Sequence, residues 1–175
     1  MSFNYAFTAK NGKQVRLRPA QASDALDIIT SVKEIVDAGE YLNKETPRSL
    51  EEEKAFILEI KKNNNMYSVI ELDGRAIGIC HLIKGELEMK KHTGNFRTWL
   101  SSEGQGLGIS SEIMKYTIRW GSEHGLYKIW LTVFAGNEVA IKVYEKAGFV
   151  VEGIQKGQAN INGSLQDEIF MAYFL

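Results

Sequence analysis

Three glycines stand close together where an expected strand ends and an expected helix begins. Gly104, Gly106 and Gly108 fall within residues 101–109, and the helical pattern follows directly. Because glycine has no Cβ, a bulky anion can approach the backbone there, and the start of a helix offers unpaired N–H groups with a partial positive charge. The spacing therefore suits a pyrophosphate, although a flexible turn that only connects two elements would show the same glycines.

Two common phosphate loops do not fit this run. A P-loop ends in Gly-Lys-Ser/Thr, whereas Gly108 is followed here by Ile109 and Ser110. A dinucleotide fingerprint that starts at Gly104 needs glycine or alanine at position 109, and it opens a parallel βαβ unit, whereas this loop follows hairpin strands. A nucleotide-binding switch therefore loses support.

A second candidate pair lies further along the chain. Asn137 and Tyr144 are seven residues apart, so on a helix they share one face about two turns, or ~10.5 Å, apart. One end of that helix could hold an elongated ligand while the phenol addresses its reactive end. A plain N-cap for Asn137 and a half-buried packing ring for Tyr144 are the structural alternatives.

The elements that would position these residues mix hairpins with crossovers. Strands are expected within residues 1–18 and over 66–71, 76–83, 95–100, 128–134, 149–152 and 168–173. Helices are expected from Ser23 to Gly39, from a Ser49/Glu52 capping box past Ile60, from Ile109 to Gly125, and from Asn137 to Gly148. This order predicts an α/β (mixed α+β) sheet with helices on its faces, in a single domain over residues 1–175.

Composition excludes several classes of function. With 44% hydrophobic and 25% charged residues the chain is typical of soluble globular proteins. The net charge is −1 and the strongest basic cluster, residues 90–92, is too short to track a nucleic-acid backbone. No apolar run approaches the ~20 residues of a membrane helix, and residues 1–13 lack the apolar core of a signal peptide. Cys80 is the single cysteine, so it cannot form an internal disulfide. We therefore expect a cytoplasmic protein with no nucleic-acid or membrane partner, and Cys80 in its core.

The two candidate regions together resemble a known superfamily. Gln105-x-x-Gly108, followed two residues later by the small Ser110, is similar to the pyrophosphate-binding motif of the Gcn5-related N-acetyltransferases (GNAT). Residues 99–109 resemble the branch that acetylates ribosomal-protein N-termini and polyamines. Residues 137–149 resemble the second signature of the superfamily, and Asn162-Gly163 with residues 167–171 resembles its C-terminal strand.

The resemblance implies a fold and an activity. The fold would be a mixed, mostly antiparallel central sheet flanked by about four helices. The activity would be N-acetyl transfer from acetyl-coenzyme A to a primary amine (a small-molecule amine, a polyamine or a protein N-terminus) by direct attack, without a metal. The strands before and after the glycine loop should splay apart, so that the pantetheine arm lies between them like an extra strand. A non-catalytic acyl-coenzyme A sensor on the same fold is the alternative, and because relatives are often dimers a homodimer is also open.

The resemblance also assigns residues to the coenzyme. The implied contacts are Leu100, Ser101, Gln105, Gly106, Leu107, Gly108, Ile109, Ser110, Asn137 and Tyr144. Asn137 would contact the pantetheine arm, and Tyr144, near the thioester sulfur, would be the catalytic acid that protonates the departing thiolate. Many relatives have lysine or arginine where this chain has Leu107, so backbone donors would carry most of the pyrophosphate contact.

The general base is left open by the sequence. Amine acetylation needs a neutral nucleophile, so a side chain or a water chain must take its proton. Relatives often use a glutamate on the central strands, but residues 95–100 contain none. The candidates are His81, His92, Glu71 and Glu88.

The acceptor is not specified by any motif. We expect residues 39–48 and 84–94 to choose it. Glu51–Glu53 could attract a polyamine or form only a charged first helical turn. Trp99 and Trp130 could line a substrate cleft, with packing as the alternative.

Overall fold

The computed structural model describes residues 3–37, 39 and 46–175. Its strands are β1 (Tyr5–Thr8), β2 (Gln14–Pro19), β3 (Met66–Leu72), β4 (Arg75–Lys84), β5 (Thr93–Leu100), β6 (Lys128–Phe134), β7 (Val150–Ile161) and β8 (Ser164–Phe174). Its α-helices are α1 (Ala25–Asp37), α2 (Leu50–Lys62), α3 (Ile109–Glu123) and α4 (Glu138–Lys146), and its 3-10 turns are η1 (Ala22–Asp24), η2 (Glu88–Lys90) and η3 (Ser102–Gly104). The predicted order of elements is confirmed, while most of the predicted acceptor loop, residues 39–48, lies outside the described residues.

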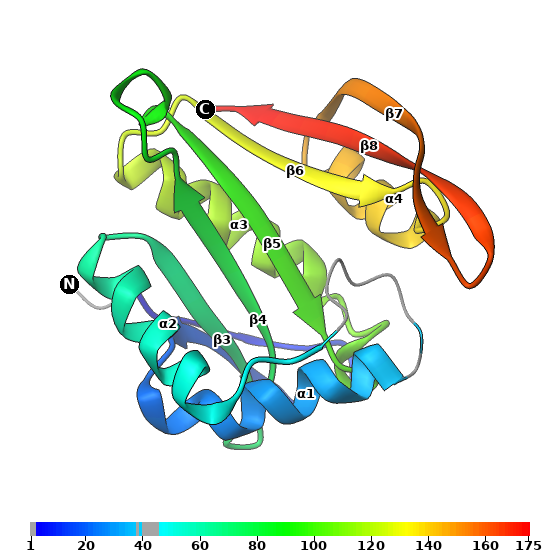
Figure 1. The fold of residues 1–175 in the computed structure, drawn as a ribbon. Helices are drawn as coiled ribbons and strands as arrows, with labels where there is room; N and C mark the ends of the chain where they lie inside the picture. Colours follow the sequence, from blue (N-terminus) through cyan, green and yellow to red (C-terminus); the bar gives the residue numbers. More distant parts are fainter. Residues whose placement is uncertain (1–2, 38, 40–45) are drawn as a thin grey trace.

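Within the described residues, eight strands form one sheet in the order β1-β2-β3-β4-β5-β6-β8-β7. Neighbouring strands are antiparallel except for β5 and β6, which are parallel. Helices α1 and α2 cover one face with a smaller core, whereas α3 and α4 pack on the larger core of the other face (Figure 1). The predicted mixed, mostly antiparallel sheet with flanking helices is confirmed.

Local signals in the sequence set the start of α2 and the turn from β3 to β4. The Ser49 hydroxyl accepts the Glu52 N–H at 3.3 Å, and the Glu52 carboxylate accepts the Ser49 N–H at 2.8 Å, which is the predicted capping box. Asp73 and Gly74 have positive φ of 51° and 80°, as a tight hairpin turn requires.

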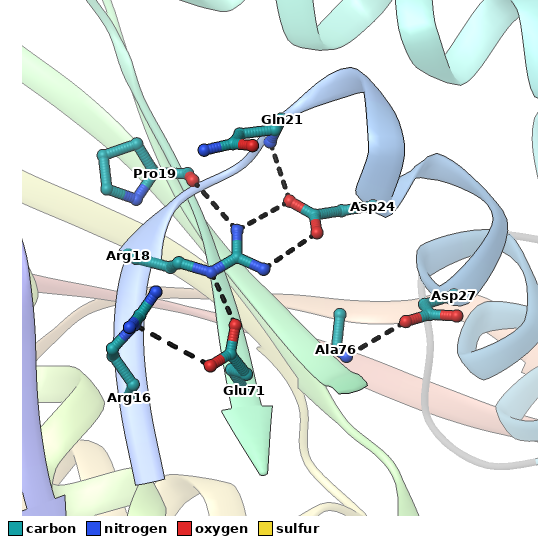
Figure 2. A network of polar contacts seen from close by, with 8 residues as sticks. All are labelled: Arg16, Arg18, Pro19, Gln21, Asp24, Asp27, Glu71 and Ala76. Atoms are coloured by element: carbon teal, nitrogen blue, oxygen red, sulfur yellow. Dashed lines mark hydrogen bonds and ion pairs between the residues drawn. The ribbon is translucent and has the colours of Figure 1, made fainter. Parts of the chain in front are cut away.

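A partly buried ionic network joins β2 and β3 to the turn η1 that leads into α1 (Figure 2). The Arg18 guanidinium on β2 donates to both oxygens of Asp24, at 2.8 and 2.9 Å, and its Nε donates to Glu71 on β3 at 2.6 Å. The Gln21 N–H donates to the same Asp24 carboxylate at 2.8 Å. Burial opposes the charge on Asp24, but these hydrogen bonds outweigh it and lower its pKa. The network therefore holds α1 against the sheet.

The last hairpin is longer than the sequence predicts. Strands were expected over 149–152 and 168–173, but β7 and β8 extend over 150–161 and 164–174, and Figure 1 shows them reaching beyond β6. Most side chains of β7 are exposed, and the strand carries two irregularities in its pairing. An exposed, irregular strand has no alternating apolar signal, so its length could not be predicted from periodicity.

Candidate functional site

The parallel strands β5 and β6 separate partway along their length. In the described residues they pair only between Thr93–Asn95 and Lys128–Trp130, and beyond this they diverge (Figure 1). Successive peptides of a strand point their polar groups to opposite sides, so the diverging edges keep backbone donors and acceptors available. The predicted opening between the strands that flank the glycine loop is present.

The glycine loop ends at the N-terminus of α3. Gly106 and Gly108 have φ of 73° and 80°, which only glycine adopts readily, and Gly108 is the N-cap. Across the described part of the chain, no acceptor pairs with the N–H groups of Gly106, Leu107 or Gly108. The first turn of α3 adds further N–H groups that the helix itself cannot pair. This row of donors suits an anion.

A lysine from the first hairpin reaches the same loop. The Lys10 N–H donates to the Leu107 carbonyl at 3.1 Å. A Cβ built on Gly108 would come within 3.4 Å of Lys10 Cε, so the aliphatic chain of Lys10 lies over the N-cap of α3. No carboxylate among the described residues pairs with the Lys10 ammonium. The loop therefore has a cation close by, although position 107 is leucine.

A cleft of about 600 Å³, the loop-side cleft, lies between this loop, β5 and α4. Five residues of the predicted coenzyme site line it: Leu100, Gln105, Ser110, Asn137 and Tyr144. Ile113, Met114, Ala140 and Val143 add apolar walls. An elongated, partly apolar ligand with an anionic end would match this lining.

The other predicted coenzyme residues do not line this cleft. Ser101 is 3% exposed and lines a separate small cavity beside α1, and its buried hydroxyl has no hydrogen-bond partner in the described structure. Ile109 is buried in the core and Leu107 packs against it. Gly106 and Gly108 offer backbone only. Gly104 serves packing, because a Cβ there would come within 2.7 Å of Leu100.

Asn137 and Tyr144 both belong to the α4 region and both face the cleft. The Asn137 Oδ1 accepts the Ala140 N–H at 3.2 Å, so Asn137 is the N-cap, and its amide N–H groups are left for other partners. The Tyr144 ring meets Phe96 edge-on at 6.5 Å and lies 6.0 Å from Phe149. Burial raises the pKa of Tyr144 to about 12, so its hydroxyl stays protonated at neutral pH.

A second cleft of about 460 Å³, the strand-side cleft, joins the first. The residues common to both linings are Thr98, Trp99, Asn137 and Tyr144. The strand-side cleft has an apolar wall that includes Phe56, Ile83 and Phe96, and it carries the charged side chains of Arg48, Arg97 and Glu168. Arg48 lies just before α2, Arg97 on β5 and Glu168 on β8, and no sequence motif pointed to them.

Of the four candidate bases, only His81 lies in a cleft. His81 is 8% exposed and lines the strand-side cleft. His92 lies near Tyr127 at the start of β6, Glu71 is bound by Arg18, and Glu88 pairs with Lys91 on the surface. Glu168 joins His81 as a titratable group of the strand-side cleft.

The remaining predicted residues have structural surroundings. Cys80 is fully buried, as predicted, and burial raises the pKa of its thiol. Trp130 stacks on Phe170, whereas Trp99 lines both clefts. Within Glu51–Glu53, the first residue pairs with Lys54, the second forms the capping box and the third is buried against Arg48 and Tyr67. This cluster is therefore engaged within the protein.

In residues 3–37, 39 and 46–175, no three His, Cys, Asp or Glu side chains gather as a metal site would need. No helix in this part of the chain is both long and apolar enough to cross a bilayer.

The sequence of this chain is similar to one protein family and to several characterised relatives. A profile of the Acetyltransferase (GNAT) family matches residues 33–149, which is more than half of the chain. Over 107 residues the chain is 35% identical to spermidine N(1)-acetyltransferase of Escherichia coli K12, a match that covers 61% of this chain and 56% of the relative. The chain thus spans little more than half the length of that relative.

Solved structures of low sequence identity have the same fold. Ribosomal-protein-alanine N-acetyltransferase from Brucella melitensis superposes with a TM-score of 0.83 at 21% identity, covering 91% of this chain and 99% of that one. A GNAT superfamily phosphinothricin acetyltransferase from Sinorhizobium meliloti, solved in complex with acetyl-coenzyme A, superposes with a TM-score of 0.85 at 23% identity, covering 97% and 89%.

Proposed function

Because the chain belongs to the GNAT acetyltransferase family, we propose that it transfers an acetyl group from acetyl-coenzyme A to a primary amine. The observation that carries the proposal is the junction of the two clefts at Thr98, Trp99, Asn137 and Tyr144. One substrate can enter from each side, so that their reactive ends meet beside the Tyr144 phenol. Holding both substrates together in this way favours direct transfer.

The loop-side cleft is the proposed coenzyme site. The unpaired N–H groups from Gly106 to Ser110 would hold the pyrophosphate, with the Lys10 ammonium nearby. The pantetheine arm would lie in the opening between β5 and β6, where Asn137 can donate from its side-chain amide. Ser101 is not assigned a side-chain contact in this arrangement, because the residue lines another cavity and its hydroxyl is buried.

The strand-side cleft is the proposed acceptor site. The lone pair of the neutral amine attacks the thioester carbonyl carbon, a C–N bond forms, and the C–S bond breaks with its electron pair going to sulfur. The amine loses one proton, for which Glu168 and His81 are the acceptors that line this cleft. The thiolate gains one proton, so that the products are an acetamide and the free thiol.

Tyr144 is the proposed acid for the thiolate. Its pKa of about 12 is above the ~8.5 of an ordinary alkyl thiol such as cysteine, so complete proton transfer to the thiolate is uphill. The hydroxyl therefore helps chiefly by donating a hydrogen bond as negative charge develops on sulfur. We therefore expect it to contribute about tenfold to kcat, just below the ~10²–10⁴ range of general acids.

Thiol release tests the proposed function. Purified protein is mixed with acetyl-coenzyme A and a panel of primary amines, and free coenzyme A thiol is followed together with the mass of the acetylated amine. The proposal predicts release that depends on both the amine and the intact loop-side cleft. Tight binding of acetyl-coenzyme A without turnover of any amine would instead favour the non-catalytic sensor.

A further inference from the structure

The strand-side cleft carries two guanidinium groups that the acetyl-transfer reaction itself does not require. Two guanidinium groups and one carboxylate line it, on elements that are far apart in the sequence. Arg48 precedes α2, Arg97 is on β5, and Glu168 is on β8, across the opening between β5 and β6. The arginines thus belong to the β5 side of the cleft and the carboxylate to the other side.

Arg48 is held in place before any ligand binds. Its guanidinium carbon lies 3.7 Å from the centre of the Phe56 ring, and its Nη1 donates to Glu53 at 3.1 Å. Glu53 is 2% exposed and also accepts from the Tyr67 hydroxyl. An arginine has five N–H donors, and this one uses a single donor within the described structure. The others are available at little further cost in side-chain entropy.

Arg97 provides a positive charge that no carboxylate balances within the described residues. It lies opposite His81 in the β4–β5 register, and its Nε makes one long hydrogen bond, 3.4 Å, to Asn95. Its terminal amino groups have no ion-pair partner in the described part of the protein. A guanidinium with two free terminal amino groups can bind a carboxylate in a bidentate manner.

With Glu168, the strand-side cleft has one carboxylate as well as two guanidinium groups, so it can bind both ends of a zwitterion. Glu168 is half-buried and forms no ion pair with a described residue. An acceptor with an anionic and a cationic end would place its anion on Arg97 and Arg48 and its ammonium near Glu168. The apolar wall of Phe56, Ile83 and Phe96 and the volume of about 460 Å³ fit a small molecule with an apolar portion.

Resting on the proposed acetyl transfer, we propose that the acceptor is a small primary amine that also carries a carboxylate, of the class of a free amino acid. Arg97 and Arg48 bind the carboxylate and so orient the amine toward Tyr144. A polyamine fits this cleft less well, because its several positive charges would meet two guanidinium groups. The acidic residues Glu51–Glu53 do not offset this, since each is engaged within the protein.

The test compares acceptors that differ only in the carboxylate. Steady-state thiol release is measured with the twenty free amino acids, with the corresponding amino-acid amides, and with spermidine. We expect the best free amino acid to exceed its own amide in kcat/KM by roughly tenfold or more. The Arg97→Gln variant should lose most of this preference through KM, while its Kd for acetyl-coenzyme A stays unchanged.

Controls separate this inference from the proposed function. Arg119→Gln changes an exposed arginine of α3 that lines neither cleft, and it should keep the preference. The inference is overturned if amides or spermidine turn over as well as the free amino acids. It is also overturned if Arg97→Gln leaves the preference for the free amino acid intact. Neither result contradicts acetyl transfer itself. If no amine turns over, amino acids are titrated calorimetrically into coenzyme A-saturated protein. Absence of binding there also overturns the inference, whereas failure to bind acetyl-coenzyme A overturns the proposed function.

Discussion

Lys10 lies over Gly108, with its aliphatic chain 3.4 Å from the position that a Cβ on the glycine would take. This contact is between the turn of the first hairpin and the N-terminus of α3, about a hundred residues later in the chain. It brings an ammonium group close to the backbone donors of the glycine loop. A lysine distant in sequence can therefore supply the positive charge that Leu107 lacks.

Lys10→Ala should weaken binding of acetyl-coenzyme A by roughly two- to fivefold at low ionic strength, because an exposed charge pair contributes up to about 1 kcal/mol. Lys13→Ala is the matched control, since Lys13 is in the same turn but pairs with Asp73 at 2.7 Å. Calorimetric Kd values at two salt concentrations measure the difference. Equal Kd values for the two variants would show that Lys10 does not contact the phosphates.

Gly108→Val should weaken coenzyme binding far more than Leu107→Ala. Valine is strained at a φ of 80°, and its side chain would displace Lys10 from the loop. Calorimetry measures the affinity, and circular dichroism with urea unfolding confirms that the variant is folded. A folded Gly108→Val protein that binds coenzyme A like the parent would place the pyrophosphate elsewhere.

Asn137 combines a cap with a proposed ligand contact, and two variants separate these roles. Asn137→Ala removes the acceptor for the Ala140 N–H and should lower the free energy of unfolding by about 1 kcal/mol. Asn137→Asp keeps a capping oxygen but loses the amide donor. Both variants should weaken acetyl-coenzyme A binding, and only the first should lose stability. If the Asp variant binds like the parent, Asn137 is a cap alone.

The Arg18 network should dominate the ionic contribution to stability. Arg18→Met removes the guanidinium from the partly buried carboxylates of Asp24 and Glu71, which keep only the Gln21 N–H and the more distant Arg16, and this should cost about 2–3 kcal/mol. Arg119→Met, which removes an exposed pair with Glu123, should change stability by less than about 1 kcal/mol. Urea unfolding at neutral pH measures both values, and equal losses would contradict this account.

The same network predicts a pH dependence. The pKa of Asp24 is lowered in the folded protein, so its contribution is fully present above its unfolded pKa of ~3.9 and is lost as the pH falls through the folded value. The stability difference between the parent and Arg18→Met should therefore shrink below about pH 4. A difference that stays constant down to pH 2 would show that the ion pair does not titrate in this range.

Features that depend on nearby residues could be predicted from the sequence. The capping box at Ser49, the turn at Asp73-Gly74 and the helix start after Gly108 each involve residues within a few positions of one another. The position of Tyr144 on the cleft follows from its helix and the spacing to Asn137. These local patterns were enough for the order of the elements, whereas the residues expected along the loop-side cleft came from the resemblance to the family.

The strand-side cleft could not be predicted in this way. Arg48, Arg97 and Glu168 line one cleft only because β5 separates from β6 and α2 packs on β3, and neither arrangement leaves a periodic signal. At Ser101 the motif position next to the loop predicted a coenzyme contact, but the residue lines a different cavity in the folded protein. The charges of a site built from distant elements require the folded structure.

The Tyr144 hydroxyl is proposed to assist departure of the coenzyme thiolate, and the kcat of the Tyr144→Phe variant measures this contribution. Phenylalanine keeps the ring that packs on Phe96 and loses only the hydroxyl, so we expect Kd for acetyl-coenzyme A to change less than about twofold. We expect kcat to fall about tenfold, just below the ~10²–10⁴ range of general acids, because the hydroxyl chiefly donates a hydrogen bond. With a pKa of about 12, the ratio of kcat to that of the parent should stay constant from pH 7 to 10.

Tyr127→Phe, at an exposed tyrosine outside both clefts, controls for loss of a phenol and should retain the kcat of the parent. The measurement is made with a saturating amine, with pre-steady-state kinetics confirming that chemistry limits turnover. A tenfold loss of kcat with intact coenzyme binding is the predicted result. An unchanged kcat in Tyr144→Phe would contradict the account and leave Tyr144 as a packing residue.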